Sequence, residues 1–363
     1  MSVRGRTVAG MSTVHTIIPP YLLSRIAESA EPRFPAAAHA ARMTLAMQPL
    51  VRRSRARIDL TLDAGGALVA ALSDAPDRTI SDAQNTDALP GITVRREEDP
   101  PVDDVAVNEA FDGLGATFDL LLAAFGRNSI DGVGGPLEAT VHFGIDYDNA
   151  FWDGTRMVFG DGDGEVFTGF TRSVSVIGHE LAHGVVQHTA GLIYQGQSGA
   201  LNESVADVFG ALTEQYLAGE SAQDATWLIG AGIFTAEVQG TALRSMIAPG
   251  TAYDDDMLGR DPQPGHMDDY VTTSEDNGGV HINSGIPNRA FALAAMALAE
   301  PAWLRVGVVW YRTLTGGLSS TVNFIEFADA TIATSLAEYG EDSEVTGAIR
   351  AAWAAVGVTR DGW

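Results

Sequence analysis

Apolar residues recur with a helical period through most of the second half of the chain, whereas the first half mixes helical and strand-like patterns. The spacing predicts a helix over 105–125 and strands over 140–143 and 157–159. Further helices are predicted over 175–190, 202–217, 284–298, 303–314, 323–339 and 346–356. The pattern therefore indicates an α+β fold class, with a mixed α/β half followed by a mainly helical half.

The first ninety residues have a different pattern. Short helices are predicted over 22–29 and 36–48, and a small hairpin over 59–72 around a pair of glycines. The stretch from Ser73 to Pro90 is polar and rich in turn-forming residues. We therefore expect an exposed linker there, which would also be a natural place for a proteolytic cut.

Charge is distributed unevenly along the chain. The net charge is −25, yet the first 60 residues hold nine arginines against three acidic residues, and lysine is absent throughout. An acidic body repels phosphate backbones, which argues against nucleic-acid binding. The basic segment fits an element that docks on the acidic remainder, and a solvated basic tail is the alternative.

The composition excludes several other classes. The 363 residues include no cysteine, so a transition metal would have to be held by histidines and carboxylates. No run approaches the ~18 apolar residues of a membrane helix. The N-terminus lacks the apolar stretch of about 7–15 residues that marks a secretory signal, because Pro19 and Pro20 interrupt its longest apolar run. We therefore expect neither membrane insertion nor classical secretion.

The most informative motif is H-E-x-x-H, formed by His179, Glu180 and His183 within a predicted helix. Histidines four residues apart lie ~40° apart around a helix, so both imidazoles can bind one metal ion. Glu180 lies beside this pair, where it can take a proton from a metal-bound water. The motif predicts a hydrolytic zinc site.

A catalytic zinc ion needs a third protein ligand. His188 is nearest in sequence, but it lies ~180° from His179 around the helix. Glu203 is the better candidate, because it follows a turn-rich break and lies at the start of a second helix that can pack against the first. Asp207, one turn later on the same face, suits a carboxylate that accepts the free N–H of a ligand histidine. The alternative is that both acids only solvate a helix face.

Several segments resemble the thermolysin family of neutral zinc metalloproteases. The most specific is HELAHGVVQHTAGLIYQGQSGALNESVADVFG, over 179–210. The N-terminal IIPPYLL, over 17–23, resembles the short propeptides of the protealysin-like branch. The family resemblance runs from about Gln84 to the C-terminus, and its other segments lie in the family's order: 147–164, 242–246, 275–291, 327–331 and 351–358.

The resemblance implies a domain division and an activity. A propeptide over 1–83 would precede an α/β catalytic domain over 84–190 and a helical catalytic domain over 191–363. The protein would be a zinc endopeptidase that cuts before bulky hydrophobic residues and is made as an autoprocessed proenzyme. Its partners would be peptide substrates, its own propeptide and a proteinaceous inhibitor. We expect a monomer that is cytoplasmic or exported by a non-classical route.

The resemblance also assigns catalytic roles. Tyr194 and His281 would stabilise the oxyanion of the tetrahedral intermediate, and Asp276 would orient His281. Without the resemblance, His281 could equally be a structural histidine in a glycine-rich loop. The zinc ligands would be His179, His183 and Glu203, with Glu180 as the general base and then the proton donor.

Substrate contacts follow from the same resemblance. Asn149 and Ala150 would hold the substrate backbone, and Arg244 would hold a substrate carbonyl. The pocket for the residue after the cut would be lined by apolar side chains, namely Phe167, Phe170, Val176 and Leu243.

The chain departs from the family in two places. Acids of the family's double calcium site are replaced, which makes Ca²⁺ binding doubtful because calcium needs six to eight oxygen ligands. The GDGDG loop over 160–164 is expected to be a turn rather than a calcium loop. Related propeptides often carry a cysteine shortly before the proline pair, where this chain offers only His15. Whether His15 approaches the zinc is left open, and a packing role is the alternative. The replaced calcium positions are Ser175, Thr226, Leu228 and Ala231, with Glu214 retained.

Two other functions are weaker alternatives. A binding protein on an inactive protease scaffold would be expected to lack Glu180 or Glu203, and both are present. A metal-dependent aminopeptidase would need an anionic subsite for a free N-terminus, which the sequence does not identify.

Overall fold

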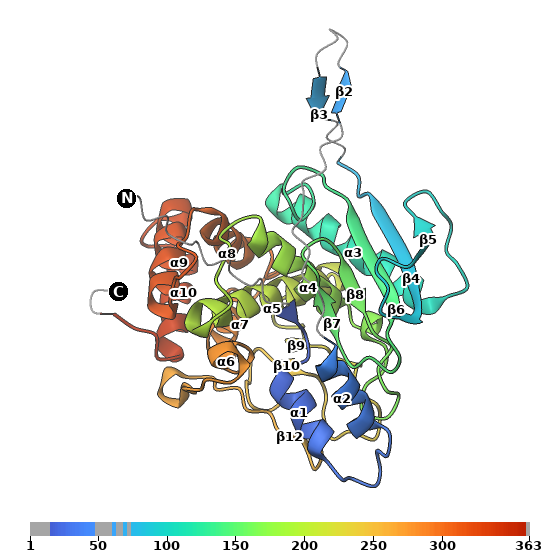
Figure 1. Cartoon of the computed structure of the whole chain (residues 1–363). Helices are drawn as coiled ribbons and strands as arrows, with labels where there is room; N and C mark the ends of the chain where they lie inside the picture. Colours follow the sequence, from blue (N-terminus) through green and yellow to red (C-terminus); the bar gives the residue numbers. More distant parts are fainter. Residues whose placement is uncertain (1–14, 48–59, 63–67, 71–73, 361–363) are drawn as a thin grey trace, which may run out of the picture.

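The structure is a computed structural model that describes residues 15–47, 60–62, 68–70 and 74–360. Figure 1 shows a sheet-containing half, in cyan and green, beside a helical half that runs to red at the C-terminus. The predicted α+β architecture is therefore confirmed. The glycine pair of the predicted hairpin and six of the nine N-terminal arginines lie outside the described residues: Arg4, Arg6, Arg52, Arg53, Arg55 and Arg57.

The first half is built around a six-stranded mixed sheet. β6 is parallel to β4 and β8, and the other neighbouring pairs are antiparallel. The N-terminal segment contributes the edge strand β1, which pairs with β7. The strand order is β1 (His15–Thr16), β7 (Ala150–Trp152), β8 (Met157–Phe159), β6 (Leu137–Phe143), β4 (Arg78–Thr86) and β5 (Ile92–Arg96).

The polar stretch after residue 73 contains a strand, so the linker prediction over 73–90 is wrong. β4 lies between β6 and β5, and its residues Ile80, Ser81 and Ala83 are buried. Its sequence RTISDAQNT is rich in residues that strands usually avoid, but pairing on both sides satisfies its backbone. The propeptide boundary expected at residue 83 falls inside this strand.

Helix α3 (Val105–Phe125) packs across β4 and β6 and has the ends that the sequence predicts. Asp104 begins it by accepting hydrogen bonds from the backbone N–H groups of Ala106 and Val107. Gly126 ends it in the left-handed conformation. Helix α4 (Val174–Gln187), which carries the H-E-x-x-H motif, packs between α3 and the long helix α5 (Gly196–Ala218).

The second half is mainly helical and packs around buried aromatic side chains such as Phe291, Trp310 and Trp353. None of the described helices is long and apolar enough to cross a membrane. After α5 come α6 (Asp276–Asn283), α7 (Gly285–Leu298), α8 (Arg305–Thr315), α9 (Phe324–Tyr339) and α10 (Glu344–Ala355). The shorter elements are the 3-10 turns η1 (Phe170–Arg172) and η2 (Met267–Asp269) and the strand pairs β9 (Leu228–Ile229) with β10 (Arg244–Ser245) and β11 (Asp254–Asp255) with β12 (Gly259–Arg260).

The N-terminal segment forms β1, α1 (Pro20–Glu28), α2 (Ala37–Ala46) and the hairpin of β2 (Leu60–Leu62) and β3 (Leu68–Ala70), which confirms the predicted hairpin. In Figure 1 this hairpin stands away from the rest of the molecule. The segment docks mainly through buried apolar side chains: Ile17, Ile18, Leu22, Leu23, Ile26 and Phe34.

Polar contacts of the docked segment are few. The Arg25 side chain donates to the Met257 carbonyl at 3.0 Å, and a carboxylate oxygen of Glu165 accepts from two N–H groups at the start of α2. Among the described arginines of the segment, only Arg33 pairs with an acid of the body, Asp256, at 3.8 Å. Apolar burial therefore contributes more to the described interface than ion pairing.

We expect Asp148→Asn to stabilise the protein, and to do so more at pH 8 than at pH 5. The Asp148 carboxyl is fully buried without a hydrogen-bond partner, and burial, followed by the charge of Asp163, raises its pKa to about 9. The folded state thus binds a proton that the unfolded state releases above about pH 4, so wild-type stability falls by about 1.4 kcal/mol per pH unit between these two values. Melting temperatures at both pH values measure the effect, with exposed Asp342→Asn as control. An equal gain at both pH values would contradict the prediction.

Candidate active site

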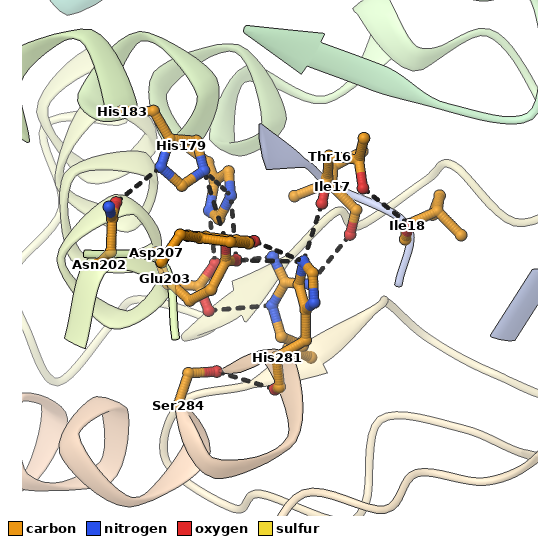
Figure 2. Close-up of polar contacts among 12 residues, drawn as sticks. Thr16, Ile17, Ile18, His179, His183, Asn202, Glu203, Asp207, His281 and Ser284 are labelled. Carbon is orange, nitrogen blue, oxygen red and sulfur yellow. Dashed lines mark hydrogen bonds and ion pairs between the residues drawn. The ribbon is translucent and has the colours of Figure 1, made fainter. Parts of the chain in front are cut away.

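Helices α4 and α5 bring the H-E-x-x-H motif and Glu203 together. They approach closely because glycines meet at their crossing: a Cβ on Gly178 would lie only 3.1 Å from the Cα of Gly210. His179 Nε2 and His183 Nε2 are 3.1 Å apart, and they lie 3.5 and 3.6 Å from the two oxygens of Glu203. Figure 2 shows these buried side chains converging.

Hydrogen bonds fix the protonation of both imidazoles. His179 Nδ1 lies 2.8 Å from Asp207 Oδ1, and His183 Nδ1 lies 2.9 Å from Asn202 Oδ1. Because these oxygens only accept, each ring carries its proton on Nδ1 and turns the lone pair of Nε2 into the site. Burial lowers the pKa of His183 well below its ordinary value, so this ring is neutral.

The donor set fits a zinc ion. Two Nε2 lone pairs face each other, and the buried Oε2 of Glu203 has no hydrogen-bond partner. Such an arrangement is unfavourable without a cation between the donors. Two imidazoles and one carboxylate are the ligands of a catalytic zinc site that keeps one position open.

Glu180 lies on the same helix turn but outside the hydrogen-bond network. Its carboxyl group is fully buried, and neither oxygen has a hydrogen-bond partner among the described residues. Burial raises its pKa well above the ordinary value, and the nearby Glu203 adds to the shift. A carboxylate of raised pKa that is free of partners is suited to proton transfer.

His281 approaches the site from α6, opposite α4. Left-handed residues over 277–279 turn the chain so that Asp276 accepts from both the backbone N–H and Nδ1 of His281, at 2.9 and 2.6 Å. Although burial opposes the charge, Asp276 and Glu203 raise the pKa of His281 to about 9. The hydroxyl of Tyr194 donates to Glu203 and lies 3.2 Å from His281 Nε2. Two donors therefore face the centre of the site.

The N-terminal segment lies along the strand predicted to hold substrate. The Ile17 N–H donates to the Ala150 carbonyl at 3.1 Å, and Arg244 donates to the Ile17 carbonyl at 3.2 Å. Asn149 accepts from the Ile18 N–H at 2.9 Å and donates to its carbonyl at 3.2 Å. The predicted substrate-binding groups Asn149, Ala150 and Arg244 are therefore brought together, and all of them contact this segment.

The same strand reaches the catalytic groups. The Thr16 carbonyl accepts a hydrogen bond from His281 Nε2 at 2.9 Å (Figure 2). The ring of His15 packs on His183 and Tyr194, with centroids 4.4 and 4.2 Å away. Burial, with the neighbouring charge of other histidines, lowers the pKa of His15 to about 3.

Arg244 also binds Asp207, the carboxylate that orients His179. Two of its nitrogens donate to the two oxygens of Asp207 at 2.9 and 2.8 Å, and Asn288 of α7 donates to the same carboxylate at 2.8 Å. Burial opposes its ionisation, but Arg244 and His179 hold the pKa of Asp207 below its ordinary value. Asp207 therefore remains an anion that orients His179.

Two supporting residues are missed by the sequence analysis. Asn202 orients His183, and its position directly before Glu203 is the only sequence signal for this role. Asn288 carries no such signal, because only packing of α7 brings it to Asp207. His188 lies outside the cluster, on the exposed end of α4, with Nδ1 donating to the Gly184 carbonyl at 2.9 Å.

The predicted pocket side chains are all buried. The rings of Phe167 and Phe170 lie 5.7 Å apart. They belong to the same apolar core as Val176, Leu243 and the Ile17 side chain. The four predicted side chains and Ile17 are therefore all buried in the main apolar core, and the pocket that they would form stays a prediction.

The positions compared with a calcium site make other contacts. Ser175 Oγ accepts from the Gly230 N–H at 3.1 Å, and Glu214 lies beside Ser175. In the GDGDG loop, Asp163 Oδ1 accepts from the three backbone N–H groups of residues 165–167 at 2.8–2.9 Å, as in a turn. The expectation that the chain does not bind Ca²⁺ at these positions stays a prediction.

Comparison with known proteins agrees with this geometry. Residues 72–187 match the thermolysin metallopeptidase catalytic domain, and residues 190–358 match the thermolysin metallopeptidase alpha-helical domain. The chain is 47% identical over 349 residues to an extracellular metalloprotease of Pectobacterium carotovorum subsp. carotovorum, covering 94% of this chain and 96% of the relative. It is 49% identical over 276 residues to the protease PrtS of Photorhabdus sp. (strain Az29), covering 75% and 74%.

A solved structure is similar over nearly the whole length. The precursor of protealysin, a metalloproteinase from Serratia proteamaculans, superposes with a TM-score of 0.85 at 46% identity, covering 95% of this chain and 100% of that one. Two domain matches, close relatives and the H-E-x-x-H geometry agree. The chain belongs to the thermolysin family of zinc metalloendopeptidases.

Proposed function

We propose that the protein cleaves peptide bonds on the N-terminal side of bulky hydrophobic residues and is made as a precursor that processes itself. The observation that carries the proposal is the seating of residues 16–18 along β7. Asn149, Ala150 and Arg244 hold this segment by its main chain. Such contacts suit the interior of a polypeptide and require no free N-terminus, which favours an endopeptidase over an aminopeptidase.

The metal and its supports follow from the donor set. His179, His183 and Glu203 would hold zinc, while Asp207 and Asn202 keep the imidazoles in the required tautomer. When bound, zinc polarises the scissile carbonyl and lowers the pKa of a water molecule.

The chain's own residues would then handle protons and charge. Glu180 takes a proton from the attacking water and delivers it to the leaving amine. His281 and Tyr194 donate to the developing oxyanion, and Asp276 keeps His281 charged and oriented. In support, the Thr16 carbonyl accepts from His281 as a scissile carbonyl would. By this alignment Ile17 occupies the position after the cut.

Specificity is the first testable part of the proposal. We expect cuts before Leu, Phe, Ile and Val, because an apolar pocket gains ~25 cal/mol for each Å² of apolar side chain that it buries. A peptide library is digested by the trimmed enzyme, with blocked and free N-termini in parallel. The cut sites measure the specificity, and the comparison of blocked with free peptides distinguishes an endopeptidase from an aminopeptidase. A profile dominated by cuts before acidic residues, or strict dependence on a free N-terminus, would refute the proposal.

The N-terminal segment would act as a propeptide that blocks the active site. Its residues 15–18 make contacts that a substrate would need, and Ile17 is fully buried. Since β4 belongs to the main sheet, we propose that the activating cut lies before Arg78 rather than at residue 83. Relatives described as extracellular also favour action outside the cell, and we make no choice between export routes.

We expect full-length protein to be at least tenfold less active than protein trimmed before Arg78. Occupied substrate contacts exclude competing peptides until the segment leaves. N-terminal sequencing and peptidase assays during incubation follow the change, and full-length Glu180→Gln should stay intact if processing is autocatalytic. Equal activity of intact and trimmed protein would reject the blocking role and leave the catalytic assignment standing.

A further inference from the structure

Strand β1, which occupies the proposed substrate site, also places His15 beside the metal cluster, by which we mean His179, His183 and Glu203. His15 offers an imidazole nitrogen that lies, together with ligand atoms of His183 and Glu203, in a group whose members are all within 4.8 Å of one another. Two members of this group, His183 and Glu203, also belong to the proposed zinc site. Pro19 and Pro20 follow this strand, and no other histidine of the chain lies just before a pair of prolines.

Hydrogen bonds hold the backbone of the segment in place beside the cluster. His15 pairs with Trp152 in the sheet, and the Thr16 carbonyl accepts from His281 at 2.9 Å. One residue further on, Ile17 bonds to both Ala150 and Arg244. These bonds fix the main chain beside the cluster, and packing of the His15 ring on His183 and Tyr194 holds the side chain there.

The side chain itself lacks a partner that would explain its position. His15 Nδ1 is buried without a hydrogen-bond partner, and leaving a buried polar atom unsatisfied costs about 1–3 kcal/mol. Ring packing on His183 and Tyr194 does not satisfy this nitrogen. The His15 imidazole is therefore not committed to another polar partner through Nδ1 and lies beside groups that can hold a metal ion.

We propose that His15 is a ligand of the zinc ion in the full-length chain, in addition to His179, His183 and Glu203. This proposal rests on the proposed zinc site and adds one residue to it. Three protein ligands leave a catalytic zinc one open position, whereas four protein ligands make the closed site typical of structural zinc. The intact protein therefore holds a closed site, and departure of the segment reopens the position that water needs.

The proposal also explains why the segment resists cleavage. The Thr16–Ile17 peptide lies with its carbonyl on His281, as a scissile bond would. With the His15 imidazole at the fourth position, the nucleophilic water is excluded while the peptide is bound. The protein's own strand is thus held like a substrate but lacks the attacking group.

Spectroscopy of the full-length protein tests the proposal without an activity assay. All variants are made in a Glu180→Gln background, which should remain uncut, and are loaded with Co²⁺. The chain has no cysteine, so His15→Cys introduces a single thiol. We expect a thiolate-to-cobalt charge-transfer band for His15→Cys, and none for His15→Ser or for His39→Cys, which changes an exposed propeptide histidine.

A second measurement keeps the native residue. X-ray absorption at the zinc edge should report three imidazoles in full-length Glu180→Gln and two after His15→Ala, and a chelator should remove zinc at least tenfold faster from the latter. Two imidazoles with His15 present, or no band for His15→Cys at stoichiometric cobalt, would overturn the proposal. Failure of the Glu180→Gln parent to bind metal would instead overturn the proposed zinc site.

Discussion

Glu180→Gln is expected to lower kcat of the trimmed enzyme by about 10³-fold or more, while zinc content and fold stay unchanged. The carboxyl group is buried and shares no hydrogen bond with another side chain of the described residues, so the isosteric amide disturbs little of the structure. What is lost is a carboxylate beside the proposed zinc ligands that can accept a proton and is not itself one of those ligands.

The measurement needs protein trimmed by an unrelated protease, because this variant is not expected to process itself. Zinc content by elemental analysis and the melting temperature serve as internal controls, and Glu214→Gln, on α5, controls for loss of a half-buried carboxyl elsewhere. Activity within tenfold of wild type would show that another group is the base.

Glu203→Ala is expected to weaken zinc affinity by more than the 10–100-fold that loss of an outer hydrogen-bond partner costs. Its carboxylate lies within 3.6 Å of both ligand histidines, and two imidazoles alone hold zinc weakly. Dialysis against a weak chelator, followed by zinc analysis, separates this loss from a catalytic defect.

The controls for this second variant are close at hand. Glu214→Ala changes an acid on the same helix without reaching the cluster, and Asp207→Asn should weaken zinc affinity less, because Asp207 orients His179 and does not bind the metal itself. A Glu203→Ala protein that keeps its zinc through dialysis would remove Glu203 from the ligand set.

The sequence predicts an element of the fold well when neighbouring residues determine it, and poorly when contacts with distant segments do. α3 is predicted to its ends because its start and stop signals are local: Asp104 caps the first turn, and Gly126 ends the helix in the left-handed conformation. β4 is misread because its polar sequence favours turns, and only pairing with β6 and β5 makes it a strand. α5 begins at Gly196, earlier than predicted, because tertiary packing overrides the glycines in its first turn.

The site divides in the same way. The H-E-x-x-H spacing places the two proposed ligands His179 and His183 and Glu180 without any tertiary information, and Glu203 requires only that the next helix pack back against the first. Asn288 and the approach of His15 depend on contacts between segments distant along the chain, which no periodic pattern encodes.

The pairing of β1 with β7 has a consequence for the trimmed enzyme. If β1 leaves as proposed, β7 becomes an unpaired strand edge that can bind an extended chain through backbone hydrogen bonds, with the apolar pocket adding a preference for the side chain. Segments of a target protein that form helices or paired strands are not available as extended chains, so we expect a folded protein to be cut only where its structure opens locally. On folded target proteins, cleavage rates should therefore report local unfolding. Segments that open more often should be cut faster, whatever their sequence alone would predict.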